Sequence, residues 1–170
     1  CVADRLAQLL GVLSLSATDR FRSTVEGSLG RAGAHPAALV HLDANPGESV
    51  QALAAVLRIS QPAAVKVADR LAADGLLERR PGPDRRTRAL HLTAKGCRTS
   101  ARLLAERAAA LDCVLAVLDR EDRGRLEALL EKLVGALAGD RGGALTVCRL
   151  CDRSTCCGAP AGCPLQHTAI

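Results

Sequence analysis

Five of the chain's eight cysteines lie close together, between positions 148 and 163. Cys148, Cys151, Cys156 and Cys163 place four potential thiolates in a stretch that also contains glycine and proline residues suited to tight turns. Soft, deprotonated sulfur ligands at this density are typical of a closed tetrahedral zinc site. We therefore expect these four cysteines to bind one zinc ion per chain, and we keep Cys157 and His167 as reserve ligands.

The residues alone leave three uses of this cluster open. A structural zinc knot that pins the tail to the preceding helices is favoured, because closed sulfur sites bind zinc tightly. The alternative is a metal- or redox-responsive sensor, in which oxidation of the thiolates releases the metal. A thiol oxidoreductase using Cys148 and Cys151 is disfavoured, since no βαβ pattern typical of thioredoxins surrounds that pair.

A second chemical feature is the basic segment from residue 76 to residue 98. It contains seven Lys or Arg side chains and two acidic ones, so its own net charge of +5 equals the net charge of the whole chain. Concentrated positive charge binds polyphosphates, because each neutralised phosphate releases counterions. A solvated charged face is the common alternative, and the surrounding elements must decide between the two. The basic residues are Arg79, Arg80, Arg85, Arg86, Arg88, Lys95 and Arg98.

The elements around this segment predict a helix-turn-helix unit followed by a hairpin. Ser49 and Ser60 are suited to cap two short helices that a tight turn separates. The second of these helices has one apolar face and is expected to end at Gly75. Two short strands, 76–80 and 88–92, then flank the loop 81–87. The apolar face consists of Ala64, Val67, Ala68 and Leu71.

The remainder of the chain is predicted to be mostly helical. Apolar residues recur at steps of three and four between residues 2 and 29, and a short buried helix is expected at 37–42. Thr93 and Asp119 are suited to cap two longer helices. Regular structure is then expected to end at Gly139, Gly142 and Gly143. The apolar stripe expected on the first long helix consists of Cys97, Ala101, Leu104, Ala108, Leu111, Leu115 and Leu118.

Composition excludes several classes of protein. Phe21 is the single aromatic residue, so the core must be aliphatic, and binding modes that stack bases on aromatic rings are excluded. Cys97 is expected in the core and Cys113 on the surface, while His35, His41 and His91 lack ligand spacing and are expected to be structural. There is no Gly-rich phosphate loop, nucleophile elbow or HExxH motif, so we expect no enzyme.

Residues 60–96 resemble the winged-helix core of MarR-type bacterial transcriptional regulators. The resemblance is carried by SQPAAVKVADRLAADGLLERR at 60–80 and by PGPDRRTRALHLTAKG at 81–96. Asp84, Arg85 and Arg86 match the acidic, basic and Arg positions of the family's wing signature. The strand exit and helix start after the wing are matched by Leu92, Thr93 and Gly96. The family's order of elements is kept from about residue 6 to residue 138.

The resemblance implies a mainly α fold, namely a winged helix-turn-helix with a two-stranded wing and long terminal dimerisation helices. It divides the chain into an N-terminal dimerisation helix at 1–32, a DNA-binding lobe at 33–92 and C-terminal dimerisation helices at 93–138. Residues 139–170 are then a Gly-rich linker and a cysteine-rich metal-binding tail. The tail itself resembles an extension found in a subset of these regulators, which favours the zinc interpretation over disulfides.

A homodimer of this kind is expected to read double-stranded DNA with two recognition helices one helical turn apart, so its operator should be palindromic. Ser60, Gln61, Val65 and Lys66 lie near the exposed start of the helix that Ser60 caps. Gln61 is positioned for a base edge, and Val65 is positioned either for a thymine methyl group or for packing against the base of the wing. Lys66 and Arg70 are positioned for phosphates. In the family pattern the position of Arg86 enters the minor groove and that of Asp84 orients it. Backbone contacts are expected from Arg85 and Arg88.

The functional expectation is a DNA-binding transcriptional regulator with a structural zinc site in its tail. The alternative is a sensor in which the cysteine tail controls DNA binding in response to metal or oxidant. Relatives of this type often bind small-molecule effectors between the DNA-binding lobe and the dimer helices, so such an effector is possible here too. No apolar run of about 18 residues and no signal-peptide pattern is present, so we expect a cytoplasmic protein without a membrane span.

Overall fold

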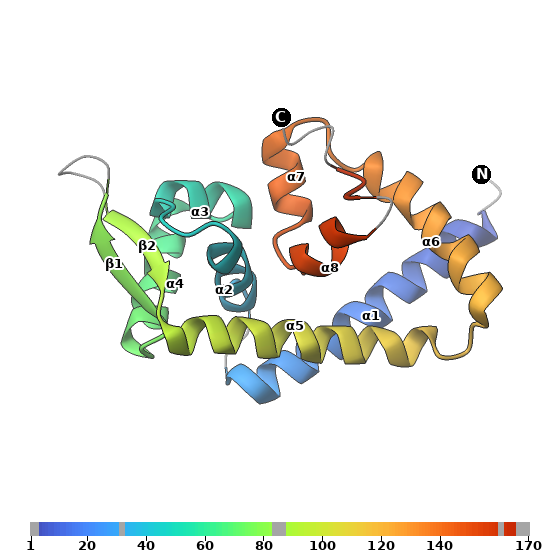
Figure 1. The fold of residues 1–170 in the computed structure, drawn as a ribbon, viewed down its shortest axis with the longest axis horizontal. Helices are drawn as coiled ribbons and strands as arrows, with labels where there is room; N and C mark the ends of the chain where they lie inside the picture. Colours follow the sequence, from blue (N-terminus) through green and yellow to red (C-terminus); the bar gives the residue numbers. More distant parts are fainter. Residues whose placement is uncertain (1–3, 31–32, 83–87, 160–161, 166–170) are drawn as a thin grey trace.

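The computed structural model of the chain describes residues 4–30, 33–82, 88–159 and 162–165. Figure 1 shows a lobe of short helices and a hairpin at one end, joined to long helices that extend away from it. The elements in chain order are α1 (Arg5–Leu29), α2 (His35–Ala44), α3 (Val50–Leu57), α4 (Gln61–Ala73), β1 (Leu77–Pro81), β2 (Arg88–Leu92), α5 (Ala94–Leu115), α6 (Arg120–Gly135), α7 (Arg141–Val147) and α8 (Arg153–Gly158). This is the mainly α winged helix expected from the sequence.

An aliphatic core holds the lobe together. Leu39, Leu42, Leu53, Leu71 and Leu90 come from α2, α3, α4 and β2, and each of them is fully buried. The helix α2 is buried along Pro36–Leu42, as predicted, because α3, α4, α5 and β2 all pack around it. Burying a leucine side chain stabilises a fold by roughly 1.5–3 kcal/mol, so this cluster fixes how α4 and the hairpin are oriented.

The helix starts are set by local capping chemistry. Ser49 accepts a hydrogen bond from the Ala52 amide at 3.1 Å, and Ser60 accepts one from the Ala63 amide at 3.4 Å. Thr93 and Asp119 cap α5 and α6 in the same way. Each such cap contributes about 1 kcal/mol by satisfying an amide that the helix leaves free. All four predicted caps are confirmed.

The hairpin is a two-stranded antiparallel sheet in which Leu77 pairs with Leu92 and Pro81 pairs with Arg88. The first strand begins one residue later than predicted, since Leu76 is still in the turn after α4. A single bridge joins Glu48 to Leu90, so β2 is also attached to the turn that follows α2. The bridge thereby ties β2 to the lobe, and β1 packs against α4.

Gly96 fixes the junction between the hairpin and α5. A Cβ added at this glycine would lie 2.1 Å from the carbonyl oxygen of Leu76, so no larger residue fits without backbone movement. Thr93 supports the same junction, because its hydroxyl donates to the Gly75 carbonyl at 2.8 Å and its amide donates to the Leu76 carbonyl at 3.0 Å. The first turn of α5 therefore lies directly against the start of β1.

The long helices bury less than the sequence predicts. On α5 the buried residues are Gly96, Ser100 and Leu103. The predicted apolar stripe, which runs from Cys97 to Leu118, is therefore not the face of α5 that is buried within the single chain. Cys97 is exposed, which corrects its expected core position, and Cys113 is exposed as expected. The prediction failed because α5, which packs against α1, α2 and β2, buries a face that includes Gly96 and Ser100, and apolar periodicity does not reveal such a face.

The segment after α6 is more ordered than predicted. Gly142 and Gly143 lie inside α7, which Asp140 caps, and they do not end regular structure. A small cluster of Ala138, Ala144 and Leu165 is buried beside Val134 of α6. Since α7 also packs on α3, the tail joins the end of α6 to the lobe (Figure 1). A search of the described helices finds none that is long and apolar enough to cross a membrane.

Candidate nucleic-acid interface and cysteine segment

The outer face of α4 carries the residues predicted to touch DNA. Ser60, Gln61, Lys66 and Arg70 are all exposed, and Val65 is 37% exposed although it is apolar. The opposite face of α4 is buried at Ala64, Val67, Ala68 and Leu71, as the periodicity predicted. One helix thus presents amide, apolar and cationic groups together on a rigid support.

A left-handed residue makes the turn between α3 and α4. Arg58 caps the end of α3 with φ 53° and ψ 45°, and its amide is directed at the carbonyls of Ala54 and Ala55. Two residues later Ser60 begins α4 in an extended conformation. This short connection sets the angle between the two helices of the helix-turn-helix unit.

Part of the predicted basic segment is neutralised within the molecule. Arg79 of β1 pairs with Asp69 of α4 at 2.8 Å, and Arg80 pairs with Glu78 at 2.5 Å. The ammonium group of Lys95 donates to the Asp74 carbonyl at the end of α4. The contacts of Arg79 and Lys95 attach the hairpin and α5 to α4, whereas the pair of Arg80 and Glu78 lies within β1.

The remaining wing residues are placed only in part. Arg88 is exposed at the start of β2 and pairs in register with Pro81. Asp84, Arg85 and Arg86 lie outside the described residues, so their predicted roles are untested. Lys66, Arg70 and Arg88 are the predicted DNA-binding cations that the structure places on exposed surface.

The tail brings its cysteines together through two tight turns. Cys148 caps the end of α7, and its carbonyl accepts the Cys151 amide at 2.9 Å. Cys156 and Cys157 lie on α8, which begins after the capping residue Asp152. Cys163 follows Gly162, whose φ of +72° turns the chain back, and it packs with Cys148 against the Ala138, Ala144 and Leu165 cluster.

Burial distinguishes four of these cysteines from the fifth. Cys148, Cys151, Cys156 and Cys163 are half-buried, whereas Cys157 is exposed. Each of the four is near enough to the other three for their sulfurs to interact electrostatically. They are the same four that the sequence favoured as ligands.

Burial raises the pKa of Cys148, Cys151, Cys156 and Cys157. It is the largest cause for Cys148 and for Cys151, and neighbouring cysteines raise the pKa of Cys148 further. For Cys151 a hydrogen bond with Cys156 lowers the pKa, whereas the charges of Cys148 and Cys163 raise it. The pKa of Cys156 is raised to about 12 by burial, by the charge of Cys151 and by a hydrogen bond to it. The pKa of Cys157 is raised by burial and by Cys163, to which it is also hydrogen-bonded.

The sulfurs are clustered but not arranged around one point. Over the ranges that the structure describes, no group of three or more His, Cys, Asp and Glu side chains is placed so that it could hold a metal ion. The reserve ligand His167 lies outside those ranges. A metal would therefore have to draw the four thiols closer together than they are here.

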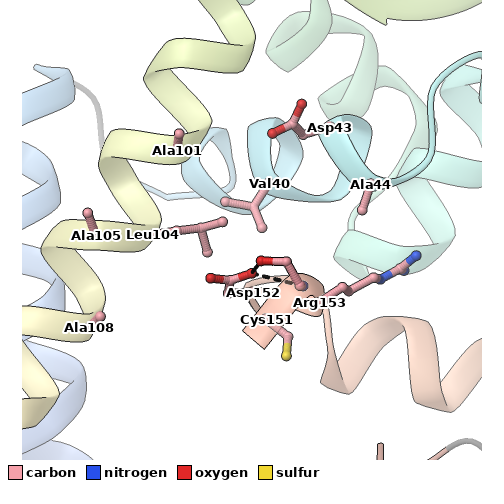
Figure 2. A pocket seen from close by; sticks show the side chains of 11 residues that line it. Val40, Asp43, Ala44, Ala101, Leu104, Ala105, Ala108, Cys151, Asp152 and Arg153 are labelled. Atoms are coloured by element: carbon pink, nitrogen blue, oxygen red, sulfur yellow. Dashed lines mark hydrogen bonds between the residues drawn. The ribbon is translucent and has the colours of Figure 1, made fainter. Parts of the chain in front are cut away.

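A cavity of about 550 Å³ lies between α2, α5 and the cysteine segment. Its walls are largely aliphatic, with Val40 and Leu104 facing its centre in Figure 2. Asp43 lines the side formed by α2, and Asp152 and Arg153 line the side formed by the tail. Asp152 is held by Ser154 and Thr155, whose hydrogen bonds lower the pKa of its carboxyl group.

The sequence did not predict a polar contact between the tail and α2. Arg153 donates to Asn45 Oδ1 at 3.1 Å, and the two residues are 108 positions apart. Asn45 contacts His41, which is 2% exposed and in turn contacts Glu48 at 2.7 Å. His41 was expected only to be structural, and no local pattern signals a contact over such a separation.

Comparisons with known proteins show which proteins this architecture is similar to. The model of the MarR family matches residues 29–87. Among solved structures, the MarR family protein Rv2887 of Mycobacterium tuberculosis is 26% identical with a TM-score of 0.62, over 78% of this chain and 97% of that one. YusO of Bacillus subtilis is 27% identical with a TM-score of 0.68, over 80% and 99%.

A third similar structure shares the fold at lower identity. MepR, a transcription regulator of the Staphylococcus aureus multidrug efflux pump MepA, is 17% identical with a TM-score of 0.68, over 78% of this chain and 98% of that one. The Rv2887 protein has also been solved in complex with salicylic acid. A search of curated protein sequences found no match. Residues 29–87 thus match the MarR family model, and the chain shares its winged-helix fold with solved transcription regulators.

Proposed function

We propose that the protein is a DNA-binding transcriptional regulator that acts as a homodimer on a palindromic operator in the cytoplasm. The observation that carries this proposal is the exposed face of α4, where Gln61, Val65, Lys66 and Arg70 are displayed beside the wing. A glutamine can pair with an adenine edge, a valine can contact a thymine methyl group, and the two cations can neutralise phosphates. The family match at residues 29–87 supports the same function.

The need for a second copy follows from exposed apolar surface. Leu6, Leu9 and Leu13 of α1 are between 46% and 70% exposed, and α6 has no buried residue. Soluble monomers rarely leave such contiguous apolar stripes in water. A two-fold dimer that covers them would present two copies of α4 and of the wing to successive major grooves. The exposed leucines of α6 are Leu129, Leu130 and Leu133, and Leu137 is exposed just after the helix ends.

Fluorescence anisotropy with labelled promoter duplexes tests DNA binding. We expect Lys66→Ala to weaken binding and to lower the slope of log K against log salt by about two, because a dimer loses two phosphate contacts worth about 0.9 each. Arg120→Ala is the matched control, since this exposed arginine begins α6 at the end of the molecule away from the lobe. Binding that does not depend on salt, or equal effects of the two variants, would contradict the proposal.

We also propose a structural zinc site formed by Cys148, Cys151, Cys156 and Cys163. Thiolate ligands suit zinc, and closing four of them on the ion would rigidify the tail between α6 and the lobe. Elemental analysis of protein purified without chelator should give about one zinc per chain. Cys156→Ser should reduce that content, while Cys113→Ser, a change at an exposed cysteine on α5, should not.

The sensor alternative has less support from these thiols. Oxidation-sensitive free thiols have lowered pKa values, whereas in the metal-free chain burial and neighbouring sulfurs raise the pKa values of Cys148, Cys151 and Cys156. If peroxide ejects bound zinc and changes operator affinity, the sensor interpretation replaces the structural one. If neither happens, the tail serves structure.

A small-molecule effector is proposed for the cavity between α2, α5 and the tail. Its volume of about 550 Å³ and its aliphatic walls suit a small, partly apolar compound. The salicylic acid complex of the mycobacterial relative supports this class of ligand. Calorimetric titration with salicylate measures the binding, and Leu104→Trp should abolish it by filling the cavity.

A further inference from the structure

The cysteine-rich tail, which begins at residue 139 and contains α7 and α8, contacts the DNA-binding lobe at two places. Its helix α7 packs on α3, the first helix of the helix-turn-helix unit. Its helix α8 supplies Arg153, whose guanidinium group donates to the side chain of Asn45 at the end of α2. Figure 2 shows Arg153 leaving the start of α8 beside Ala44. The tail is therefore in contact with the lobe as well as with the end of α6.

From Asn45 a continuous set of polar contacts leads into the lobe. The Asn45 amide group donates to the His41 carbonyl at 2.8 Å and contacts His41 Nδ1 at 3.2 Å. Because this amide nitrogen can only donate, His41 Nδ1 must accept, and the ring proton is therefore on Nε2. That proton is donated to Glu48 Oε2 at 2.7 Å. The imidazole is almost fully buried, so its orientation is held by these two partners.

The same contacts end on the wing. The Glu48 carbonyl accepts the Leu90 amide at 2.8 Å, and the Gly47 amide donates to the Leu90 carbonyl at 2.8 Å. Leu90 is fully buried in the middle of β2, two residues after Arg88. The turn between α2 and α3 is therefore hydrogen-bonded to the strand that returns from the wing. Movement of this turn would move the base of the wing with it.

We propose that Arg153 is a positioning residue that holds the wing in its DNA-binding orientation through Asn45, His41 and Glu48. This inference rests on the proposed DNA-binding function. It means that the cysteine-rich tail helps to hold the orientation of the wing. Arg153 itself does not need to touch DNA. Its role is to keep the 45–48 turn in the conformation that pairs with Leu90.

Hydrogen exchange of the free protein tests the structural link without DNA. In Arg153→Ala the amides of Leu90 and Gly47 should exchange about tenfold faster, which corresponds to losing one hydrogen bond to a charged donor. Arg153→Lys retains a donor and should restore most of the protection. Arg149→Ala is the matched control, because Arg149 lies in the same tail and donates to the Thr146 carbonyl within it. Unchanged protection in Arg153→Ala would overturn the proposal.

DNA titrations then separate positioning from direct contact. Arg153→Ala should lower operator affinity about tenfold while leaving the salt slope unchanged, since no phosphate contact is removed. A slope reduced by about two would mean that Arg153 binds phosphate, which would contradict the positioning role. If the wild-type protein binds no duplex at all, the proposed function fails, and hydrogen exchange still decides whether Arg153 orders the wing.

A double-mutant cycle tests whether Arg153 affects the wing by way of the contacts among Asn45, His41 and Glu48. Glu48→Ala removes the partner of His41 and should also expose the Leu90 amide to exchange. If Arg153 acts through this path, adding Arg153→Ala to Glu48→Ala should produce little further change. Fully additive effects of the two substitutions would overturn the path.

Discussion

At the scale of single residues, the cysteines show how neighbours change a group's chemistry. Cys156 is half-buried and hydrogen-bonded to Cys151, and its pKa is raised to about 12. A thiol with this pKa is almost entirely protonated near neutral pH and is a poor nucleophile. Binding of zinc must therefore displace protons, so zinc affinity is expected to fall as the pH falls.

The first prediction concerns alkylation of metal-free protein. At pH 8 Cys156 should react with iodoacetamide about 30- to 60-fold more slowly in the folded chain than in urea, where its pKa returns to about 9.0. Because the folded pKa is the higher one, the tail loses stability as the pH rises from about 9 toward 12. Mass spectrometry of the labelled peptides measures the alkylation rates in the folded chain and in urea. Equal rates in the folded and unfolded states would contradict the raised pKa.

At the scale of elements, the structure separates what local sequence can determine from what it cannot. The caps at Ser49, Ser60 and Thr93 were predictable because an N-cap acts within three residues of itself. The helix α7 was not predictable, because Gly142 and Gly143 disfavour helix locally. It is stabilised by the Asp140 cap together with packing on α3 and the Ala138 cluster.

The candidate site likewise has a part that local spacing predicts and a part that depends on tertiary structure. The exposed face of α4 and the four tail cysteines were identified from spacing alone, because each lies within one short stretch of chain. The contact between Arg153 and Asn45, and the pairing of Arg79 with Asp69, depend on tertiary structure that spacing does not encode. The sequence therefore predicted more free cations for DNA in the basic segment than the structure shows, because Arg79 and Arg80 pair with acidic side chains of the same chain.

The second prediction uses one substitution at two glycines. Gly96→Ala should lower stability by about 1–3 kcal/mol or more, because its Cβ would lie 2.1 Å from the Leu76 carbonyl oxygen. Gly124→Ala, in the exposed part of α6 with no atom within 4 Å of its new Cβ, should raise stability by roughly 0.5–1 kcal/mol. Urea denaturation followed by circular dichroism measures both. A Gly96→Ala variant that is as stable as the wild type would show that the junction is not tight.

At the scale of the whole molecule, the unburied long helices are the main feature. The lobe has a well-packed core, while α6 buries no residue and the first half of α1 exposes a run of leucines. A second chain that covers these surfaces would explain both the apolar residues and their helical spacing. The predicted stripe on α5, which the single chain leaves largely open, would then be explained as well.

The third prediction tests this pairing. Leu133→Lys places a charge in the apolar face of α6, where Leu133 is 52% exposed in the single chain, and should shift the protein from dimer to monomer. Ala128→Lys adds the same charge on the opposite face of α6 and should leave the dimer intact. Sedimentation velocity measures the two states. A wild-type chain that sediments as a monomer at micromolar concentration would exclude the dimer.

Recognition of DNA by a symmetric pair of winged helices is tested most directly by a hydroxyl-radical footprint on the duplex upstream of the protein's own gene. Two copies of α4 and of the wing should protect two windows on one face of the DNA, with centres about 10 base pairs apart. Substituting Gln61 by Ala should weaken both windows equally, because each is made by the same helix. A single protected window, or none at protein concentrations that saturate anisotropy, would contradict recognition by a symmetric pair of winged helices.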